Sequence, residues 1–300
     1  MRRWDLIIVG GGPAGLSAGL YAARLGLEAL LLEGSGFGGQ IVNALRVENY
    51  PGFPAGIGGA ELAERMRQQA EAQGLVMRLA EVRALEPAEG LLRVVTAGEE
   101  ALLARRVIVA SGTRPRRLGV PGEEALLGRG VSTCAVCDGP FFRGRRVAVV
   151  GGGDRALQEA LHLSELCERL WLIHRRERFR ASHVLQERLR SRPNVEFLLG
   201  TTVRRILGEG RVEALELSDG RVLEVEGVCV AVGMEPNVAF LPPQLERDEQ
   251  GFVLTDGALR TSLPGVLAAG DVRSKPLRQA VTAAADGALA AYSAATSLDR

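Results

Sequence analysis

Apolar residues near the N-terminus fall into short runs separated by glycine and by an alanine-rich stretch. A run at residues 6–9 leads into a glycine-rich turn at 10–15, an alanine-rich stretch covers 16–25, and a second run at 28–33 ends in an acid. Short apolar runs bounded by glycine are typical of buried strands, whereas the alanine-rich stretch has the composition of a helix. The pattern predicts a strand, a tight turn, a helix and a second strand.

The same order recurs in the middle of the chain. An apolar run at 147–150 precedes the turn 151–156, a helical stretch through residue 166 and a further run at 170–173. Runs at 106–113 and 228–233 close the two units, and a run at 266–271 precedes a long alanine-rich helix. We expect an α/β fold of two Rossmann-like nucleotide-binding domains. The first is discontinuous, at 1–114 and 244–300, and the second is inserted at 115–243.

Each turn carries the glycine spacing of a dinucleotide site. Gly10, Gly12 and Gly15 mark the first turn, and Gly151 and Gly153, followed by Asp154, mark the second. In such a turn the first glycine permits the bend, the second lets the backbone approach a pyrophosphate, and a third small residue allows close helix packing. The helix that follows then directs unpaired N–H groups at the phosphates.

The residues at the end of the second strand differ between the two units. In the first unit this position holds Glu33, an acid suited to the hydroxyls of an adenosine ribose. In the second unit it holds His174, followed by Arg175 and Arg176 with Arg180 close behind. Guanidinium groups there suit a 2′-phosphate, so the second site favours NADPH over NADH. The alternative is a solvated basic turn.

Composition and charge narrow the class of protein. The 300 residues are 46% hydrophobic, 24% charged and 4% aromatic, with 38 glycines, which excludes a disordered chain and a disulfide scaffold. A net charge of +1 gives no overall attraction to nucleic acid or to an anionic membrane. The chain has no uninterrupted apolar stretch long enough to span a membrane. We expect a cytoplasmic protein that binds neither nucleic acid nor membrane.

Four cysteines are present, and two of them form a C-x-x-C pair, Cys134 and Cys137. This spacing favours redox chemistry, because a local disulfide and a lowered thiol pKa are both accessible to it. Asp138 follows directly, where its carboxyl could exchange protons with the thiols, although an exposed acid at a helix start is the simpler interpretation. A zinc site would need two more ligands, so we expect no metal; an inert pair is the other alternative.

Several segments together resemble the bacterial low-molecular-weight thioredoxin reductases. The most specific are CAVCDG at 134–139, GGGD at 151–154 and HRRERFRA at 174–181. Shorter matches are GGQ at 38–40, VENYPG at 47–52, GMEPN at 233–237, GD at 270–271 and RQA at 278–280. The resemblance runs through essentially the whole chain.

The resemblance implies a homodimeric flavoprotein with a split FAD domain and an inserted NADPH domain that carries the cysteines. The residues implied to contact FAD are Gly10, Gly12, Gly15, Glu33, Gln40, Asn49, Gly270, Asp271, Arg278, Gln279 and Ala280. Those implied to hold NADPH are Gly151, Gly153, Asp154, Arg175, Arg176 and Arg180. The N-terminus of the last helix, near Arg278, would stabilise negative charge on the reduced flavin, unless it is a plain surface cap.

The implied activity moves electrons from NADPH through FAD to the Cys134–Cys137 disulfide and on to thioredoxin or a thioredoxin-like protein. Cys137 would lie nearer the flavin, Cys134 would attack the partner, and Asp138 would donate a proton. One arrangement cannot serve the nicotinamide, the disulfide and the partner at once, so we expect the inserted domain to swing near 113–117 and 233–243. Alternatives are a ferredoxin or flavodoxin reductase, a dithiol oxidase, or a nucleotide sensor without turnover.

Two positions depart from the family pattern. Arg155 stands where a small hydroxyl residue usually opens the NADPH helix, so the pyrophosphate contact is either altered or strengthened by charge. Ser111 replaces a threonine in the turn after the strand, a change that we expect to be minor.

Overall fold

A computed structural model describes residues 3–44 and 46–298. The chain divides into two compact units. Unit 1 comprises Met1–Arg114 and Glu235–Arg300, and unit 2 comprises Pro115–Met234. Residues 235–243 lie in unit 1 because Phe240 and Leu241 pack into its core, where the carbonyl of Phe240 accepts a hydrogen bond from the N–H of Leu85.

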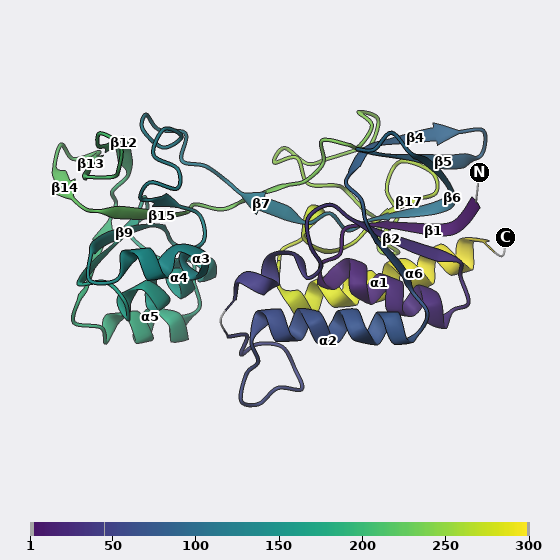
Figure 1. Cartoon of the computed structure of the whole chain (residues 1–300), viewed down its shortest axis with the longest axis horizontal. Coiled ribbons are helices and arrows are strands. Elements are labelled where there is room, and N and C mark those ends of the chain that lie inside the picture. The colour runs from purple at the N-terminus through teal and green to yellow at the C-terminus, as the bar shows by residue number, and fades with distance from the viewer. Residues whose placement is uncertain (1–2, 45, 299–300) are drawn as a thin grey trace. The chain divides into compact units, whose positions relative to one another are not determined.

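Unit 1 is built around a seven-stranded sheet. Five strands are parallel, and an antiparallel pair continues the sheet beyond β6. The parallel strands, in spatial order, are β3 (Val76–Leu79), β2 (Ala29–Glu33), β1 (Arg3–Val9), β6 (Ala101–Val109) and, pairing with β6, β17 (Val266–Ala268). The antiparallel pair is β5 (Leu91–Thr96) and β4 (Val82–Ala88). Helices α1 (Pro13–Arg24), α2 (Gly59–Ala72) and α6 (Ala280–Leu298) lie along one side of this sheet (Figure 1).

Alternation along β1 distributes its side chains between two cores, because successive side chains of a strand point to opposite faces. Leu6 and Ile8 pack with residues of α1 and α6, whereas Ile7 and Val9 pack on the other face. The two ends of the chain meet where α6 packs against α1, and a Cβ at Gly287 would lie 2.0 Å from the carbonyl oxygen of Ala14. Only a glycine permits that approach.

Unit 2 repeats the plan with five parallel strands. In spatial order they are β11 (Val195–Leu199), β10 (Arg169–His174), β9 (Arg146–Gly151), β15 (Gly227–Ala231) and β8 (Val131–Ser132). Its helices are α3 (Ala135–Asp138), α4 (Asp154–Ser164) and α5 (His183–Arg190). Val147 and Val149 pack with Leu157 and Leu163 of α4, whereas Ala148 and Val150 share a core with residues of a three-stranded antiparallel sheet. That sheet consists of β12 (Val203–Leu207), β13 (Ala214–Leu217) and β14 (Val222–Glu224).

Short segments complete the elements. They are the 3-10 turns η1 (Gly39–Asn43), η2 (Gly139–Phe142) and η3 (Gly270–Val272) and the strands β7 (Thr113–Pro115) and β16 (Met234–Pro236). The chain passes between the units through β7 and β16, which pair with each other. Ser111, one of the two departures from the family pattern, donates its hydroxyl to the carbonyl of Asn237 at 2.8 Å.

Candidate functional site

The glycine turn of unit 1 lies where β1 ends and α1 begins. Gly10 has φ +112°, and a Cβ there would lie 2.3 Å from the carbonyl oxygen of Ala110. A Cβ at Gly15 would lie 1.8 Å from the carbonyl oxygen of Gly10. At Gly12, in contrast, the nearest heavy atom would be 3.8 Å away, and no side chain caps the helix that follows. Two glycines therefore set the turn, and the third leaves open space over the start of α1.

Glu33, at the end of β2, is bound to this turn. One carboxylate oxygen accepts a hydrogen bond from the N–H of Gly11 at 2.6 Å, and the other accepts one from the N–H of Ser35 at 2.9 Å. The second oxygen also accepts the hydroxyl of Ser35 at 3.3 Å and the N–H of Gly36 at 3.5 Å, so the oxygen bound to Gly11 is the one with an acceptor position left for a ribose hydroxyl.

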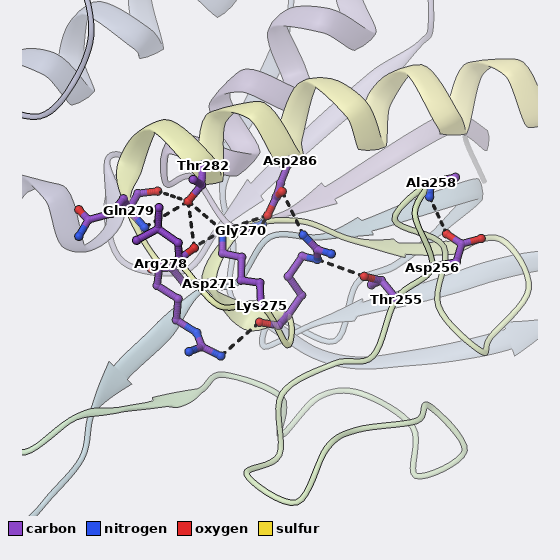
Figure 2. Close-up of polar contacts among 12 residues, drawn as sticks. Thr255, Asp256, Ala258, Gly270, Asp271, Lys275, Arg278, Gln279, Thr282 and Asp286 are labelled. Carbon is purple, nitrogen blue, oxygen red and sulfur yellow. Dashed lines mark hydrogen bonds and ion pairs between the residues drawn. The ribbon is translucent and has the colours of Figure 1, made fainter. Parts of the chain in front are cut away.

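A second polar cluster of unit 1 gathers around η3 and the start of α6 (Figure 2). The ammonium of Lys275 lies 3.0 Å from one oxygen of Asp286 and 3.5 Å from Oδ1 of Asp271. Asp286 also accepts a hydrogen bond from the N–H of Gly270 at 3.1 Å. Burial raises the pKa of Asp271, and its Oδ1 is buried without a hydrogen-bond partner among the described residues.

Arg278 and Gln279 follow on the same segment. The guanidinium carbon of Arg278 stands 3.8 Å above the centre of the Phe252 ring, and its buried Nε has no hydrogen-bond partner within residues 3–44 and 46–298. Gln279 accepts a hydrogen bond from the side chain of Asn49 at 3.1 Å, across a sequence separation of 230 residues. The fold therefore brings a residue of the 47–52 segment to the start of α6, which begins at Ala280.

Gln40 is another residue that the resemblance implies for FAD. It donates to the carbonyl of Thr113 at 3.4 Å.

The buried polar atoms of this unit fit a polar ligand. Buried polar groups in native proteins nearly always find a hydrogen-bond partner, yet Oδ1 of Asp271 has only the ammonium of Lys275 at 3.5 Å, and Nε of Arg278 has none among the described residues. Together with the open space at Gly12 and the carboxylate of Glu33, they match the donors and acceptors of a dinucleotide such as FAD.

In the glycine turn of unit 2, as in unit 1, one glycine is required by close packing and another leaves open space at the start of the helix. A Cβ at Gly151 would lie 2.4 Å from the carbonyl oxygen of Ala231 and 2.6 Å from Cβ of Ala156, whereas a Cβ at Gly153 would meet no heavy atom within 4 Å. Gly153 is the N-cap of α4, and no side chain caps this helix. The start of α4 therefore has the open approach that a pyrophosphate needs.

The arginine loop, residues 175–182, is fastened beside this turn. The N–H of Arg180 donates to the carbonyl of Gly152 at 2.8 Å, and Asp154 accepts the N–H of Ser182 at 2.6 Å. Arg175, Arg176 and Arg180 are exposed, and among the described residues their guanidinium groups form no hydrogen bond or ion pair. Three guanidinium groups without a partner beside an open helix start fit a phosphorylated nucleotide. Asp154 instead stabilises the loop, through its hydrogen bond with Ser182.

His174, the last residue of β10, directly precedes the loop. Its ring stacks on Phe179 with centroids 5.5 Å apart, and a Cβ at Gly152 would lie 2.3 Å from this ring. Burial lowers the pKa of His174, so the side chain is neutral near pH 7.

The cysteine pair lies at the start of α3. Cys134 and Cys137 form a disulfide, with Cα atoms 5.4 Å apart. Cys134 is half-buried, Cys137 is exposed, and Asp138 follows as the last residue of the helix. Cys167 and Cys229 are free and buried, and burial raises the pKa of Cys167 to about 11, so its thiol is protonated at neutral pH. Cys134 and Cys137, and not the buried thiols, are therefore the candidates for redox chemistry in unit 2.

Sequence reasoning left out two residues that the structure places in these clusters. Lys275 is the only lysine among 37 basic residues, and its side chain is only 6% exposed at the centre of the Asp271 cluster. Glu159 lies buried on α4, one turn after Arg155. The isolated lysine and the four-residue spacing were the signals available.

Within residues 3–44 and 46–298, no group of three or more His, Cys, Asp or Glu side chains could hold a metal ion. No helix in this part of the chain is long and apolar enough to cross a membrane.

Comparison with known proteins defines the class. Residues 4–287 match the pyridine nucleotide-disulphide oxidoreductases, and the chain belongs to this family. Within it, the chain is 46% identical over 296 residues to a thioredoxin reductase of Mycolicibacterium smegmatis, with 97% of this chain and 95% of that protein covered. It is 44% identical over 301 residues to a thioredoxin reductase of Treponema pallidum, covering 99% and 97%. The crystal structure of Lactococcus lactis thioredoxin reductase matches with a TM-score of 0.94 at 36% identity, covering 98% of each chain.

Proposed function

We propose that the chain is an NADPH-dependent thioredoxin-disulfide reductase that contains FAD. The observation that carries the proposal is the Cys134–Cys137 disulfide, exposed at Cys137, in the same unit as an open glycine turn and a loop in which the guanidinium groups of Arg175, Arg176 and Arg180 have no partner among the described residues. A disulfide, a nucleotide turn and a second nucleotide turn in unit 1 are the parts that such a reductase needs. The thioredoxin reductase relatives are similar to this chain over nearly their whole length, which supports the proposal.

FAD is assigned to unit 1. Gly12 leaves space for the pyrophosphate and Glu33 accepts from the ribose hydroxyls. Asp271 and Arg278 contribute a buried oxygen and a buried nitrogen that have no hydrogen bond among the described residues. Gly10, Gly15, Gln40, Asn49, Gly270, Gln279 and Ala280 complete the proposed set. When bound, the two nucleotides supply an electron pair that, with two protons, converts the disulfide into two thiols.

NADPH is assigned to unit 2. Gly153 leaves the start of α4 open for the pyrophosphate, and Gly151 sets the turn. Arg175, Arg176 and Arg180 provide guanidinium groups for the 2′-phosphate, and Asp154 holds their loop in place. NADH lacks that phosphate and should bind more weakly.

The two cysteines have separate roles in the proposal. The sulfur of Cys134, as a thiolate, attacks the partner disulfide and releases one partner thiolate, which takes up a proton. Cys137 then attacks the mixed disulfide, which re-forms the Cys134–Cys137 bond and frees the second partner sulfur as a thiol. Asp138 is proposed to move a proton at these sulfur atoms.

The assembly is proposed to be a homodimer in the cytoplasm. A groove between α1, α2 and α6 is lined by apolar residues including Leu16, Met66 and Val281, and Tyr21 and Tyr292 stand exposed on the same helices at 45% and 56%. Exposed apolar patches of this kind favour burial against a second copy. Two free thiols, Cys167 and Cys229, suit a reducing compartment. Light scattering of Tyr292→Glu should give half the mass of the native protein.

An anaerobic titration with NADPH tests the electron path. The native protein should need about two equivalents per subunit to reduce the flavin fully, because flavin and disulfide each accept two electrons. Cys137→Ser should need about one and should lose thioredoxin turnover. Cys167→Ala, which removes a buried thiol outside the pair, is the matched control and should keep two. One equivalent in the native protein would favour a ferredoxin or flavodoxin reductase.

A further inference from the structure

Arg155 occupies the first turn of α4, where a charged side chain could reach a bound pyrophosphate. The structure directs its guanidinium elsewhere. Nε donates to Glu159 at 2.8 Å, and the two terminal nitrogens contact the carbonyl of Thr133 and the sulfur of Met234. All the guanidinium nitrogens are thus engaged within unit 2, in contrast to the free arginines of the 175–182 loop.

Glu159 links this contact to the strand behind the disulfide. Its side chain is 11% exposed, and its second carboxylate oxygen accepts a hydrogen bond from the thiol of Cys229 at 3.0 Å. Burial raises the pKa of Glu159, and the neighbouring charge of Arg155 opposes that rise. The positive charge of Arg155 therefore favours the ionised form of this buried carboxylate.

The disulfide loop is attached to the same cluster by its backbone. Thr133, whose carbonyl binds Arg155, directly precedes Cys134. Ser132, one residue earlier, pairs with Cys229 in the sheet, and its hydroxyl accepts the N–H of Cys134 at 3.0 Å. Burial raises the pKa of the Cys229 thiol, and Glu159 raises it further. Direct contacts thus connect the ion pair both to the backbone before Cys134 and to the strand that pairs with Ser132.

We propose that the Arg155–Glu159 pair is a positioning device for the redox cysteines: Arg155 anchors the backbone before Cys134 and neutralises Glu159 behind the pair, and it does not bind NADPH. The inference deepens the proposed function and rests on the role given there to Cys134 and Cys137. The thiolate is the reactive form of these cysteines. Because Arg155 balances the charge of Glu159, loss of Arg155 leaves a carboxylate whose negative charge disfavours the thiolate.

The test compares Arg155→Ser with the native flavoprotein in two measurements. The disulfide is reduced with dithiothreitol, the reductant is removed, and iodoacetamide is added near pH 8, about where free cysteine titrates. Each reacting thiolate displaces iodide, and mass spectrometry follows the peptide that contains Cys134 and Cys137. Calorimetry measures the dissociation constant of NADP+, which carries the same pyrophosphate and does not reduce the flavin. Neither measurement requires turnover.

We expect Arg155→Ser to alkylate about 5- to 10-fold more slowly, since an interaction with a charged group is lost. The NADP+ dissociation constant should stay within about twofold, because the Arg155 guanidinium is engaged elsewhere. Adding Glu159→Gln to Arg155→Ser should restore the alkylation rate, because no buried carboxylate then remains. General loss of structure would act in the opposite direction, by exposing the thiols and speeding their alkylation.

Three results would each overturn the inference: an unchanged alkylation rate in Arg155→Ser, a double variant no faster than Arg155→Ser, or NADP+ binding weakened more than about tenfold. Failure of the proposed function is a separate observation, because it would appear in the native protein as absence of thioredoxin reduction by NADPH.

Discussion

Gly151 and Gly153 stand two residues apart in one nucleotide turn, yet their replacement by alanine should produce different defects. A methyl group at Gly151 would lie 2.4 Å from the carbonyl oxygen of Ala231 and 2.6 Å from Cβ of Ala156. Gly151 and Ala231 are also paired residues of β9 and β15. A methyl group at Gly153 meets no protein atom within 4 Å.

The expected size of the Gly151→Ala defect follows from this geometry. Ordinary contact would require the ends of β9 and β15 to separate by roughly 1 Å, and overpacking of a filled core costs about 1–3 kcal/mol. A loss of about 2 kcal/mol in the free energy of local unfolding lowers protection from hydrogen exchange by about 30-fold. For Gly153→Ala we expect unchanged protection, because nothing in the protein must move. The added methyl lies over the start of α4, so NADP+ should bind at least about tenfold more weakly.

Hydrogen exchange with mass spectrometry of the full-length protein measures both variants, with peptides of β9 and β15 as reporters and β1 in unit 1 as internal reference. Calorimetry with NADP+ completes the comparison. Equal loss of protection in both variants would refute the assignment of close packing to Gly151 and of ligand access to Gly153. So would native protection in Gly151→Ala, since the close approach to Ala231 would then carry no energetic consequence.

Three further predictions concern single side chains. Burial lowers the pKa of His174 in the folded protein, so as pH falls below about 6.5 the unfolded chain takes up the proton first and His174 reduces stability. His174→Asn should therefore show a smaller loss of melting temperature between pH 7 and pH 5 than the native protein. His183→Asn, at an exposed position, is the control and should lose as much as the native protein. Lys275→Met should lower the free energy of unfolding by about 2–4 kcal/mol in urea titrations, because the buried carboxylates of the Asp286 cluster lose their ammonium; an unchanged midpoint would contradict this. Arg176→Ala should weaken NADPH binding and leave NADH binding unchanged in fluorescence titrations, and equal weakening of both would exclude a contact with the 2′-phosphate.

The sequence predicted the parallel parts of the fold because their strands are buried on both faces. The runs at 6–9, 28–33, 147–150 and 170–173 correspond to β1, β2, β9 and β10. At 106–113 the pattern predicted a strand that leads into a turn of small residues, and β6 does end at Val109, but it begins earlier than predicted, at Ala101. Its first half pairs with β5 and alternates between buried and exposed residues, so it lacks a continuous apolar run.

The antiparallel strands escaped the pattern for a related reason. β4 and β5 carry arginine and glutamate at their exposed positions, and β12–β14 cover one face of a sheet while their other face meets solvent. Such strands show only weak alternation in a single sequence.

Glycine spacing and the C-x-x-C pair predicted the parts of the candidate site that are local in sequence. Contacts between distant segments were not accessible in this way. Asn49 meets Gln279 only because α6 returns to unit 1, and the bonds of Arg155 depend on where β8 places Thr133. When a side chain has several possible partners, the tertiary fold decides which of them it contacts. The two alternatives for Arg155 remained open in the sequence for this reason.

The return of α6 to α1 also bears on the order in which the chain folds during synthesis. Residues 115–234 contain every element of unit 2, so that unit is complete before the last sixty-six residues emerge from the ribosome. Unit 1 must wait for Ala280–Leu298, because until then the surface of α1 around Ala14 and Ala18 has no covering helix. Domains generally fold as units as they are made. The inserted unit is therefore the first to fold, and the core of unit 1 is completed only after residues 280–298 have been synthesised.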